Sequence, residues 1–158
     1  MKVRIGSYPK HRWYHNWLYD KFGYVSNQKM SIQIDEFDTW SMDHTLAPII
    51  LPMLIQLQET KHGSPFVDND DVPEELRMPD GWHLHNCRLT KNGETDEKFH
   101  ERWDWVLNEM IYAFDCKANK DEVYMRFDIK DRDAMDKEQE RISNGFRLFG
   151  KYYENLWD

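Results

Sequence analysis

The longest apolar run of the chain covers residues 46–55 and lies inside a segment with helix start and stop signals. Serine and aspartate precede the run, and Lys-His-Gly follows it at 61–63, a typical helix end. Because the run is apolar on all sides, we expect a buried central helix over about 41–61. Pro48 and Pro52 each remove a backbone donor, which predicts a kink or, alternatively, a break at Pro48.

Apolar residues at helical spacing predict three further helices. A short aromatic helix is expected over 11–23 and ends at Gly23. A second helix begins at Thr95 or Asp96 and fades after 115. Its expected buried stripe is Phe99, Trp103, Val106, Leu107, Met110 and Phe114. The last helix begins at Asp131 or Asp133, with an expected apolar seam of Ile142, Phe146, Phe149, Tyr153 and Leu156.

Alternation of apolar and polar residues predicts strands over 2–7, 30–35 and 123–129. A shorter strand is expected over 83–87, inside the irregular and possibly mobile segment 63–95. Together these elements predict one α+β domain over 1–158. We expect a small sheet of about three strands, packed against three longer helices and the short aromatic helix.

The chain is acidic, with 21 lysine and arginine residues against 29 aspartate and glutamate residues and a net charge of −8. This balance argues against sequence-independent nucleic-acid binding, which depends on basic side chains that neutralise phosphates. It favours a protein partner, self-association or bound cations. Aromatic residues make up 15% of the chain, and we interpret most of them as core.

The two cysteines, Cys87 and Cys116, do not form a disulfide framework, and residues 1–8 lack the apolar region of a signal peptide. The 46–55 run is shorter than the roughly 20 residues of a membrane span. We therefore expect a reduced, cytoplasmic protein without a membrane partner.

Three blocks of the sequence occur together: DTWSMDHTL at 38–46 continuing to KHGSPFVD at 61–68, RWDWVLNEMI at 102–111, and NGFRLFGKYY at 144–153. With these blocks the chain resembles a family of small, uncharacterised proteins encoded by tailed bacteriophages, marine ones in particular. The resemblance implies a phage gene product made in the cytoplasm of an infected bacterium, with association with the virion as an alternative. It implies no catalytic residues.

Two Glu-x-x-His motifs, Glu59 with His62 and Glu97 with His100, are candidate metal ligands. On a helix, residues i and i+3 share a face, as in di-iron carboxylate proteins. The first motif ends one predicted helix and the second begins the next, so the two would meet if these helices run antiparallel. The alternative is that all four are ordinary helix-end residues, with His62 as a cation at a helix C-terminus.

A third candidate is His83-x-His85-x-Cys87, which places two imidazoles and a thiol on one face of a strand. Nitrogen and sulfur ligands suit zinc, and Asp80 or Asp104 could supply a fourth. The alternative is a polar loop strand. No cofactor is expected by default. The metal ion that these histidine, glutamate and cysteine motifs would bind is zinc or iron.

Other polar groups carry weaker signals. His11 and His15 lie one helical turn apart, and Asp43 beside His44 has the order of a carboxylate that orients a general base. The acidic segment 68–71 lacks the glycine and the terminal glutamate of a calcium loop. We interpret all of these as structural, and we find no phosphate-binding glycine loop.

Two functions remain after these exclusions. The first is a protein-binding or assembly module rather than an enzyme, whose partner is a host factor or a virion component. Its interaction residues would be Tyr152, Tyr153, Leu156 and Trp157 at the end of the last helix. The second is a metal-dependent enzyme acting on a small molecule or nucleotide, with ligands drawn from the histidine, glutamate and cysteine motifs and from His44.

Overall fold

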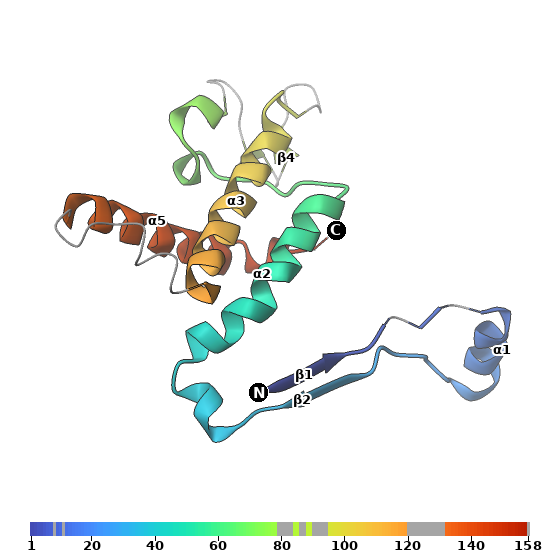
Figure 1. Ribbon diagram of the computed structural model, residues 1–158. Coiled ribbons are helices and arrows are strands. Elements are labelled where there is room, and N and C mark those ends of the chain that lie inside the picture. The colour runs from blue at the N-terminus through green and yellow to red at the C-terminus, as the bar shows by residue number, and fades with distance from the viewer. Residues whose placement is uncertain are drawn as a thin grey trace. The chain divides into compact units, whose positions relative to one another are not determined.

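The computed structural model describes residues 1–7, 9–10, 12–78, 84–85, 88–89, 95–119 and 132–157 (Figure 1). The chain divides into two compact units, Met1–Thr45 and Leu46–Asp158. We call them the N-terminal unit and the C-terminal unit and describe each by itself. The strand predicted over 123–129 lies outside the described residues.

The N-terminal unit is built on a two-stranded antiparallel ribbon of β1 (Lys2–Ile5) and β2 (Met30–Gln33). Val3 lies opposite Ile32, and Ile5 lies opposite Met30. The Gly6 amide donates to the Lys29 carbonyl over 2.8 Å and extends the pairing beyond the strands. The first two predicted strands therefore pair directly with each other.

The connection between these strands carries α1 (Trp13–Phe22), at the far end of the ribbon in Figure 1. Its start is closed by a reciprocal cap in which the Arg12 amide donates to Nδ1 of His15 over 2.9 Å. Its end is closed by Gly23, which has the left-handed φ of 63° expected of a helix-ending glycine. A short 3-10 helix, η1 (Glu36–Thr39), follows β2.

The central helix, α2 (Met42–Thr60), is continuous and contains both prolines, so the alternative of a break at Pro48 is wrong. The prediction that it is buried on all sides is also wrong. Ala47 and Leu54 are buried, but Leu46, Met53 and Ile55 on the same helix are exposed. One side of α2 contributes to the core of the C-terminal unit, and another side faces solvent.

The C-terminal unit is centred on α3 (Phe99–Ala118), which packs against α5 (Arg132–Lys151). All six residues of the stripe predicted for the first of these helices are buried, as expected. Gly145 lies where the two helices cross, because a side chain there would collide with the backbone of Glu109 and would lie 2.5 Å from Ala113 Cβ. The absence of a side chain at Gly145 therefore allows α3 and α5 to approach closely.

The apolar seam predicted for the last helix is confirmed in part, because Ile142 is buried and Phe146, Phe149 and Leu156 are partly buried against the core. The buried residues of α5 are Ile142, Gly145 and Leu148, and α5 ends at Lys151. Tyr153 lies in the following 3-10 helix, η4 (Tyr153–Asn155), and is exposed. The period expected of a single long helix therefore fails at its end, because the helix stops before the last two seam positions.

The segment between α2 and α3 contains the 3-10 helices η2 (Asn69–Asp71) and η3 (Glu74–Leu76) and a second two-stranded sheet. That sheet pairs β3 (Leu84–His85) with β4 (Arg88–Leu89) in antiparallel fashion. Within the described residues the fold is thus mostly helical with small antiparallel sheets, which is an α+β arrangement. A single sheet of three strands, as the sequence predicted, is wrong for this part of the chain.

Candidate functional site

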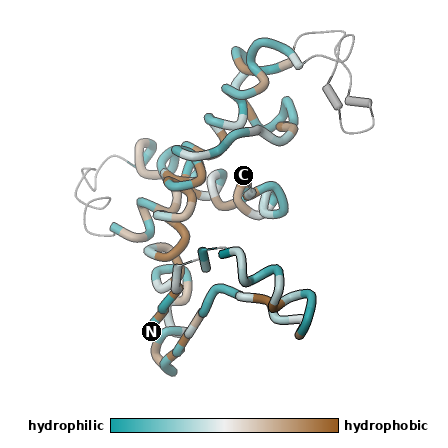
Figure 2. The backbone as a smooth tube through the Cα atoms, turned by 90° about the vertical axis from the view of Figure 1, so that its right-hand side faces the viewer, coloured by the Kyte–Doolittle hydropathy of each residue, from teal (hydrophilic) through white to brown (hydrophobic). Residues whose placement is uncertain are grey.

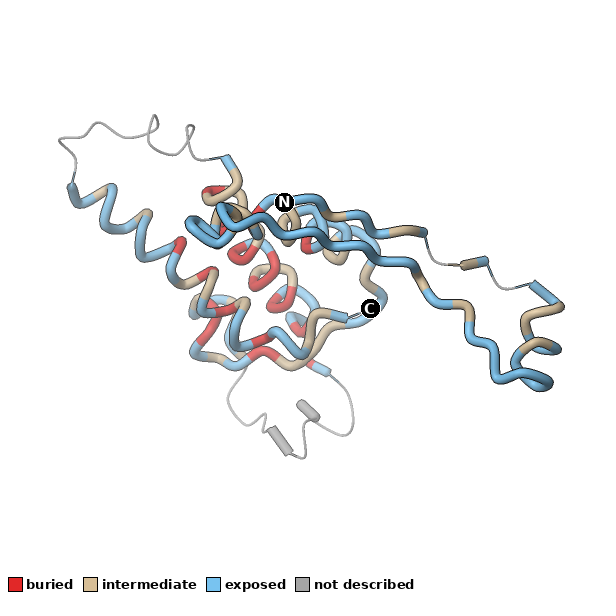
Figure 3. Tube along the Cα trace, turned by 90° about the horizontal axis from the view of Figure 1, so that it is seen from below, coloured by how far each residue is buried: buried red, intermediate tan, exposed pale blue. Residues whose placement is uncertain are grey.

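The N-terminal unit exposes its side chains to an unusual degree. Of the residues described between Met1 and Thr45, not one is buried, and Figure 3 shows β1, β2 and α1 without any red segment. Large apolar side chains are among the exposed ones. Contiguous exposed apolar surface of this kind marks interaction sites in soluble proteins.

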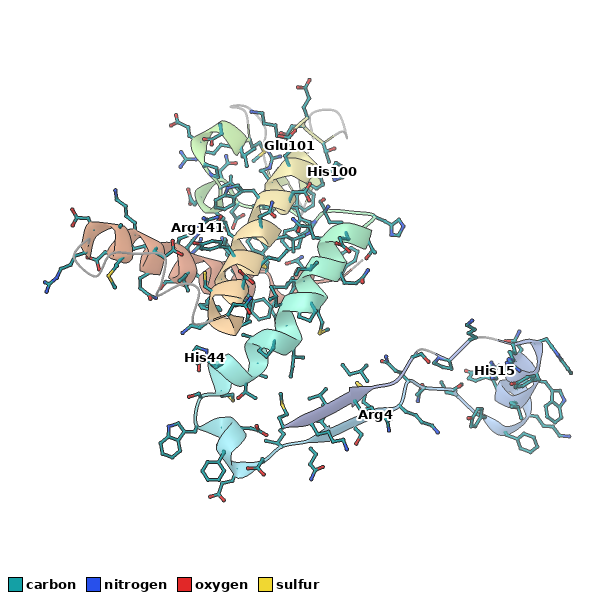
Figure 4. The ribbon with its side chains drawn as sticks, viewed as in Figure 1. Arg4, His15, His44, His100, Glu101 and Arg141 are labelled. Atoms are coloured by element: carbon teal, nitrogen blue, oxygen red, sulfur yellow. The ribbon has the colours of Figure 1, made fainter. Side chains whose placement is uncertain are left out.

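The ribbon has one apolar and one polar face, because side chains alternate along a strand. We call the apolar side, formed by Val3, Ile5, Met30 and Ile32, the ribbon face. Ile5, Met30 and Ile32 are 51%, 65% and 59% exposed. The other side carries Lys2, Arg4, Ser31 and Gln33, with Arg4 labelled in Figure 4. The brown stretches along these strands in Figure 2 mark the hydrophobic positions.

Helix α1 adds exposed aromatic rings to the same unit. Trp13 is 86% exposed, and Trp17, Tyr19 and Phe22 are exposed as well. The ammonium group of Lys21 lies 5.1 Å from the ring centre of Trp17, within cation–π range. Figure 4 shows these rings spread around α1, beside the labelled His15. The sequence interpretation assigned most aromatic residues to the core, and for this helix that assignment is wrong.

Residues 1–34 carry a net charge opposite in sign to that of the whole chain. Residues 1–34 contain six lysine or arginine residues and a single carboxylate, Asp20, although the chain carries 21 and 29. The net charge of −8 therefore combines a basic beginning with a strongly acidic remainder. Counting charge by region would have found this in the sequence, whereas the total conceals it.

The predicted interaction residues at the end of the chain fall into two groups. Tyr153 and Trp157 are exposed, at 65% and 66%. Leu156 is partly buried against the core. Tyr152 is buried, and its hydroxyl accepts from the Asp68 amide over 3.0 Å and donates to Asp71 Oδ2 over 2.6 Å. Tyr152 thus ties η2 to the end of α5 inside the C-terminal unit.

Asp71 is a buried carboxylate at the centre of an ionic network whose two cations are partly exposed. Its carboxylate accepts from Arg147 Nη1 over 2.7 Å and from Lys151 Nζ over 2.5 Å, in addition to Tyr152. Burial alone would raise the pKa of Asp71, but the hydrogen bonds from Lys151, Tyr152 and Arg147 outweigh it and hold the pKa below its usual range. Burial and the bond to Asp71 raise the pKa of Tyr152. The network fixes the segment around η2 against α5.

Two further charge clusters lie on α3. The buried guanidinium of Arg102 is paired with Asp96, whose pKa is lowered by that pairing in spite of burial. Glu109 is paired with Arg141 of α5 at 2.7 Å, and the guanidinium of Arg141 stacks 3.7 Å from the Tyr112 ring centre (Figure 4). Burial and a hydrogen bond to Glu138 raise the pKa of Tyr112 to about 12. These pairs explain why buried charges are tolerated in this core.

The two Glu-x-x-His motifs do come near the same place, as an antiparallel arrangement predicts. Three successive pairs join the chain leaving α2 to α3: Gln58 with Asn108 at 2.8 Å, Lys61 with Asp104 at 2.6 Å, and Ser64 with His100 at 3.0 Å. Glu59, His62, Glu97 and His100 are all exposed. His100 and Glu101 mark the start of α3 in Figure 4.

Among the described residues, no three histidine, cysteine, aspartate or glutamate side chains gather as a metal site. His83, Cys87, Asp80 and His11 lie outside those residues, and of the zinc motif only His85 falls in a described element, β3. His15 caps α1, and His44 lies 3.4 Å from Asp43. Asp104, the other candidate fourth ligand, is paired with Lys61.

Comparison with protein-family models, with curated proteins and with solved structures found no match to this chain. Within the parts of the chain that the structure describes, no helix has the length and apolarity needed to cross a bilayer. The candidate site that the geometry itself supports is the exposed apolar and basic surface of residues 1–34 in the N-terminal unit.

Proposed function

We propose that this chain is a phage-encoded protein-binding or assembly module that acts in the cytoplasm of the infected bacterium or in the virion, and that its N-terminal unit is the binding element. One observation carries the proposal: the described part of this unit has no buried residue and yet presents many large apolar side chains. A two-stranded ribbon alone is at best marginally stable in water. A partner that covers it would supply the missing core.

The gain from such a partner is substantial. Fully covering an isoleucine- or methionine-sized side chain contributes roughly 1.5–3 kcal/mol, and Ile5, Met30 and Ile32 are each about half exposed or more. These three residues belong to the same unit as the exposed Trp13 and Trp17. Together they supply the kind of apolar and aromatic centre that dominates the free energy of binding.

The chemistry of the surface favours protein over nucleic acid. Proteins bind single-stranded nucleic acid with aromatic rings that stack on the bases and with basic side chains that contact the backbone. Residues 1–34 contain both kinds of side chain, with most of the rings on α1. The ribbon face, however, is aliphatic, and aliphatic side chains such as Ile5 and Ile32 gain nothing from base stacking. A protein surface covers both kinds of side chain at once.

The proposal is tested by placing a photo-crosslinking amino acid at position 32 or at position 33 in the full chain, expressed in a bacterial host. Ile32 lies on the ribbon face, and the adjacent Gln33 lies on the opposite face of the same strand. Position 33 is therefore a matched control.

We expect covalent adducts of higher mass from position 32 and few from position 33. The adducts are identified by mass spectrometry. Equal labelling at both positions, or no adduct at position 32, would contradict a binding role for the ribbon face.

A further inference from the structure

We infer that the partner of the N-terminal unit is a second copy of this chain, whose helix α2 receives the ribbon face. This inference rests on the proposed function and names the partner of the same surface. It is argued from charge and from the apolar side chains that each surface leaves exposed.

Charge complementarity is the first argument. Residues 1–34 carry six basic residues and one acidic residue, while the remaining residues of the chain carry most of its 29 carboxylates. Two copies that met through residues 1–34 would bring like charges together. Contact between the basic beginning of one copy and the acidic remainder of another brings opposite charges together and speeds their encounter.

Helix α2 offers the apolar half of the match. It exposes Leu46 and Met53, which lie seven residues apart and therefore on one face of the helix. Its 19 residues contain no lysine or arginine, so its formal charges are those of Asp43 and Glu59. An apolar helix surface with acidic ends complements an apolar ribbon within a basic segment. Helix on sheet is a standard way for both elements to bury their apolar faces.

The symmetry of the contact also favours a second copy. Every copy carries one ribbon face and one exposed side of α2, so two copies can exchange these contacts reciprocally. Such an exchange closes as a dimer and leaves neither surface uncovered. A different protein would cover the ribbon face and leave Leu46 and Met53 exposed.

The experiment measures the molar mass of the full chain by sedimentation equilibrium over a range of protein and salt concentrations. We expect a concentration-dependent dimer whose dissociation constant rises with salt, because salt screens the opposite charges. Ile32→Lys and Met53→Lys should each raise the dissociation constant about tenfold or more, since each places a charge in an apolar contact. Gln33→Lys adds the same charge to the opposite ribbon face and should change it little.

Mixing the two variants tests the exchange directly. The Met53→Lys chain keeps an intact ribbon face, and the Ile32→Lys chain keeps an intact α2. An equimolar mixture can therefore form one native contact of the two, and it should associate more tightly than either variant alone. If Met53→Lys dimerises like the unmodified chain, the dimer does not use α2 and the inference is wrong.

A monomer at all concentrations would also overturn the inference, including the case in which the ribbon face packs on α2 of its own chain. The crosslinking experiment separates this failure from failure of the proposed function. Adducts from position 32 with twice the mass of the chain support self-association. Adducts with another protein retain the binding function and reject the second copy, and absence of adducts rejects both.

Discussion

The two units of this chain treat their apolar and charged side chains in opposite ways. In the C-terminal unit Trp103, Leu107 and Leu148 are almost fully buried, and the buried Asp71 and Arg102 have charged partners. In the N-terminal unit Trp13 and Ile32 are exposed, and cationic side chains lie among the rings. The C-terminal unit is held together by contacts within itself. The N-terminal unit has the composition of one side of a binding interface.

This difference teaches that composition alone does not locate the core. Aromatic residues serve as core in α3 and as surface in α1, although both helices show apolar residues at helical spacing. What separates them is whether another described element of the same unit lies against them. The following predictions test that separation, beginning with the largest expected effect.

Truncation of a core tryptophan should destabilise the protein most. Trp103 is 1% exposed and packs edge-to-face with Tyr152 at 5.8 Å. Trp103→Ala should lower the free energy of unfolding by about 3–5 kcal/mol, because it leaves a cavity in a packed core. Urea denaturation followed by circular dichroism measures this change.

Removal of the central carboxylate should cost nearly as much. Asp71→Asn leaves Arg147 and Lys151 without the charge that they share, and breaking a buried pair costs about 3–5 kcal/mol. Because both cations reach solvent, we expect the lower end of that range. The exposed neighbour Asp70 is the control, and Asp70→Asn should stay within about 0.5 kcal/mol in the same denaturation.

The helix crossing at Gly145 should tolerate no side chain. Gly145→Ala should destabilise by about 1–3 kcal/mol, because a methyl group collides with α3 and pushes the helices apart. Gly150 lies in the same helix with nothing within 4 Å of an added methyl group. Gly150→Ala should instead stabilise by about 0.5–1 kcal/mol, and the melting temperatures of the two variants should move in opposite directions.

Acid should weaken the C-terminal unit through Asp71 and Asp96. Their pKa values in the folded protein lie below those of the unfolded chain, so their contribution is complete above about pH 4. It is lost as the pH falls through the folded values. Denaturation at pH 6, 4 and 3 should show stability falling with pH, and the fall should be shallower in Asp71→Asn.

The smallest effect is expected for the tryptophan of the other unit. Trp13 is 86% exposed, so Trp13→Ala should change the stability of the dilute chain by no more than about 0.5 kcal/mol. A loss comparable to that of Trp103→Ala would show that α1 is packed in solution, and the comparison between the units would then fail.

Much of the helical framework could be predicted from the sequence. The end of α1 at Gly23, the extent of α2 and the buried stripe of α3 depend on neighbours close in sequence, and these are visible as local patterns. The end of α5 was harder to predict from the sequence. Tyr152 is held by Asp71, 81 residues earlier in the chain, so its burial is decided by a long-range contact.

The candidate site was hidden for a different reason. Alternation of Met30, Ile32 and Gln33 predicts a strand with one apolar face, but it does not say whether any part of the chain covers that face. The prediction assumed a third strand and helices against the sheet. Likewise, the net charge of the whole chain concealed the basic segment 1–34. The four interaction residues predicted at the end of the chain were chosen for their residue types, because the sequence does not show which of them are exposed.

Lys151, one of the two cations of the ionic network around Asp71, has a practical consequence for chemical labelling. Lys151 Nζ lies 2.6 Å from Asp68 and 2.5 Å from Asp71, and these bonds raise the pKa of Lys151 in spite of its partial burial. Acylating dyes attack the neutral amine, so this lysine should react slowly. The exposed Lys10, Lys21 and Lys29 should react before it, so a fluorophore added at low stoichiometry would leave the ionic network around Asp71 unlabelled.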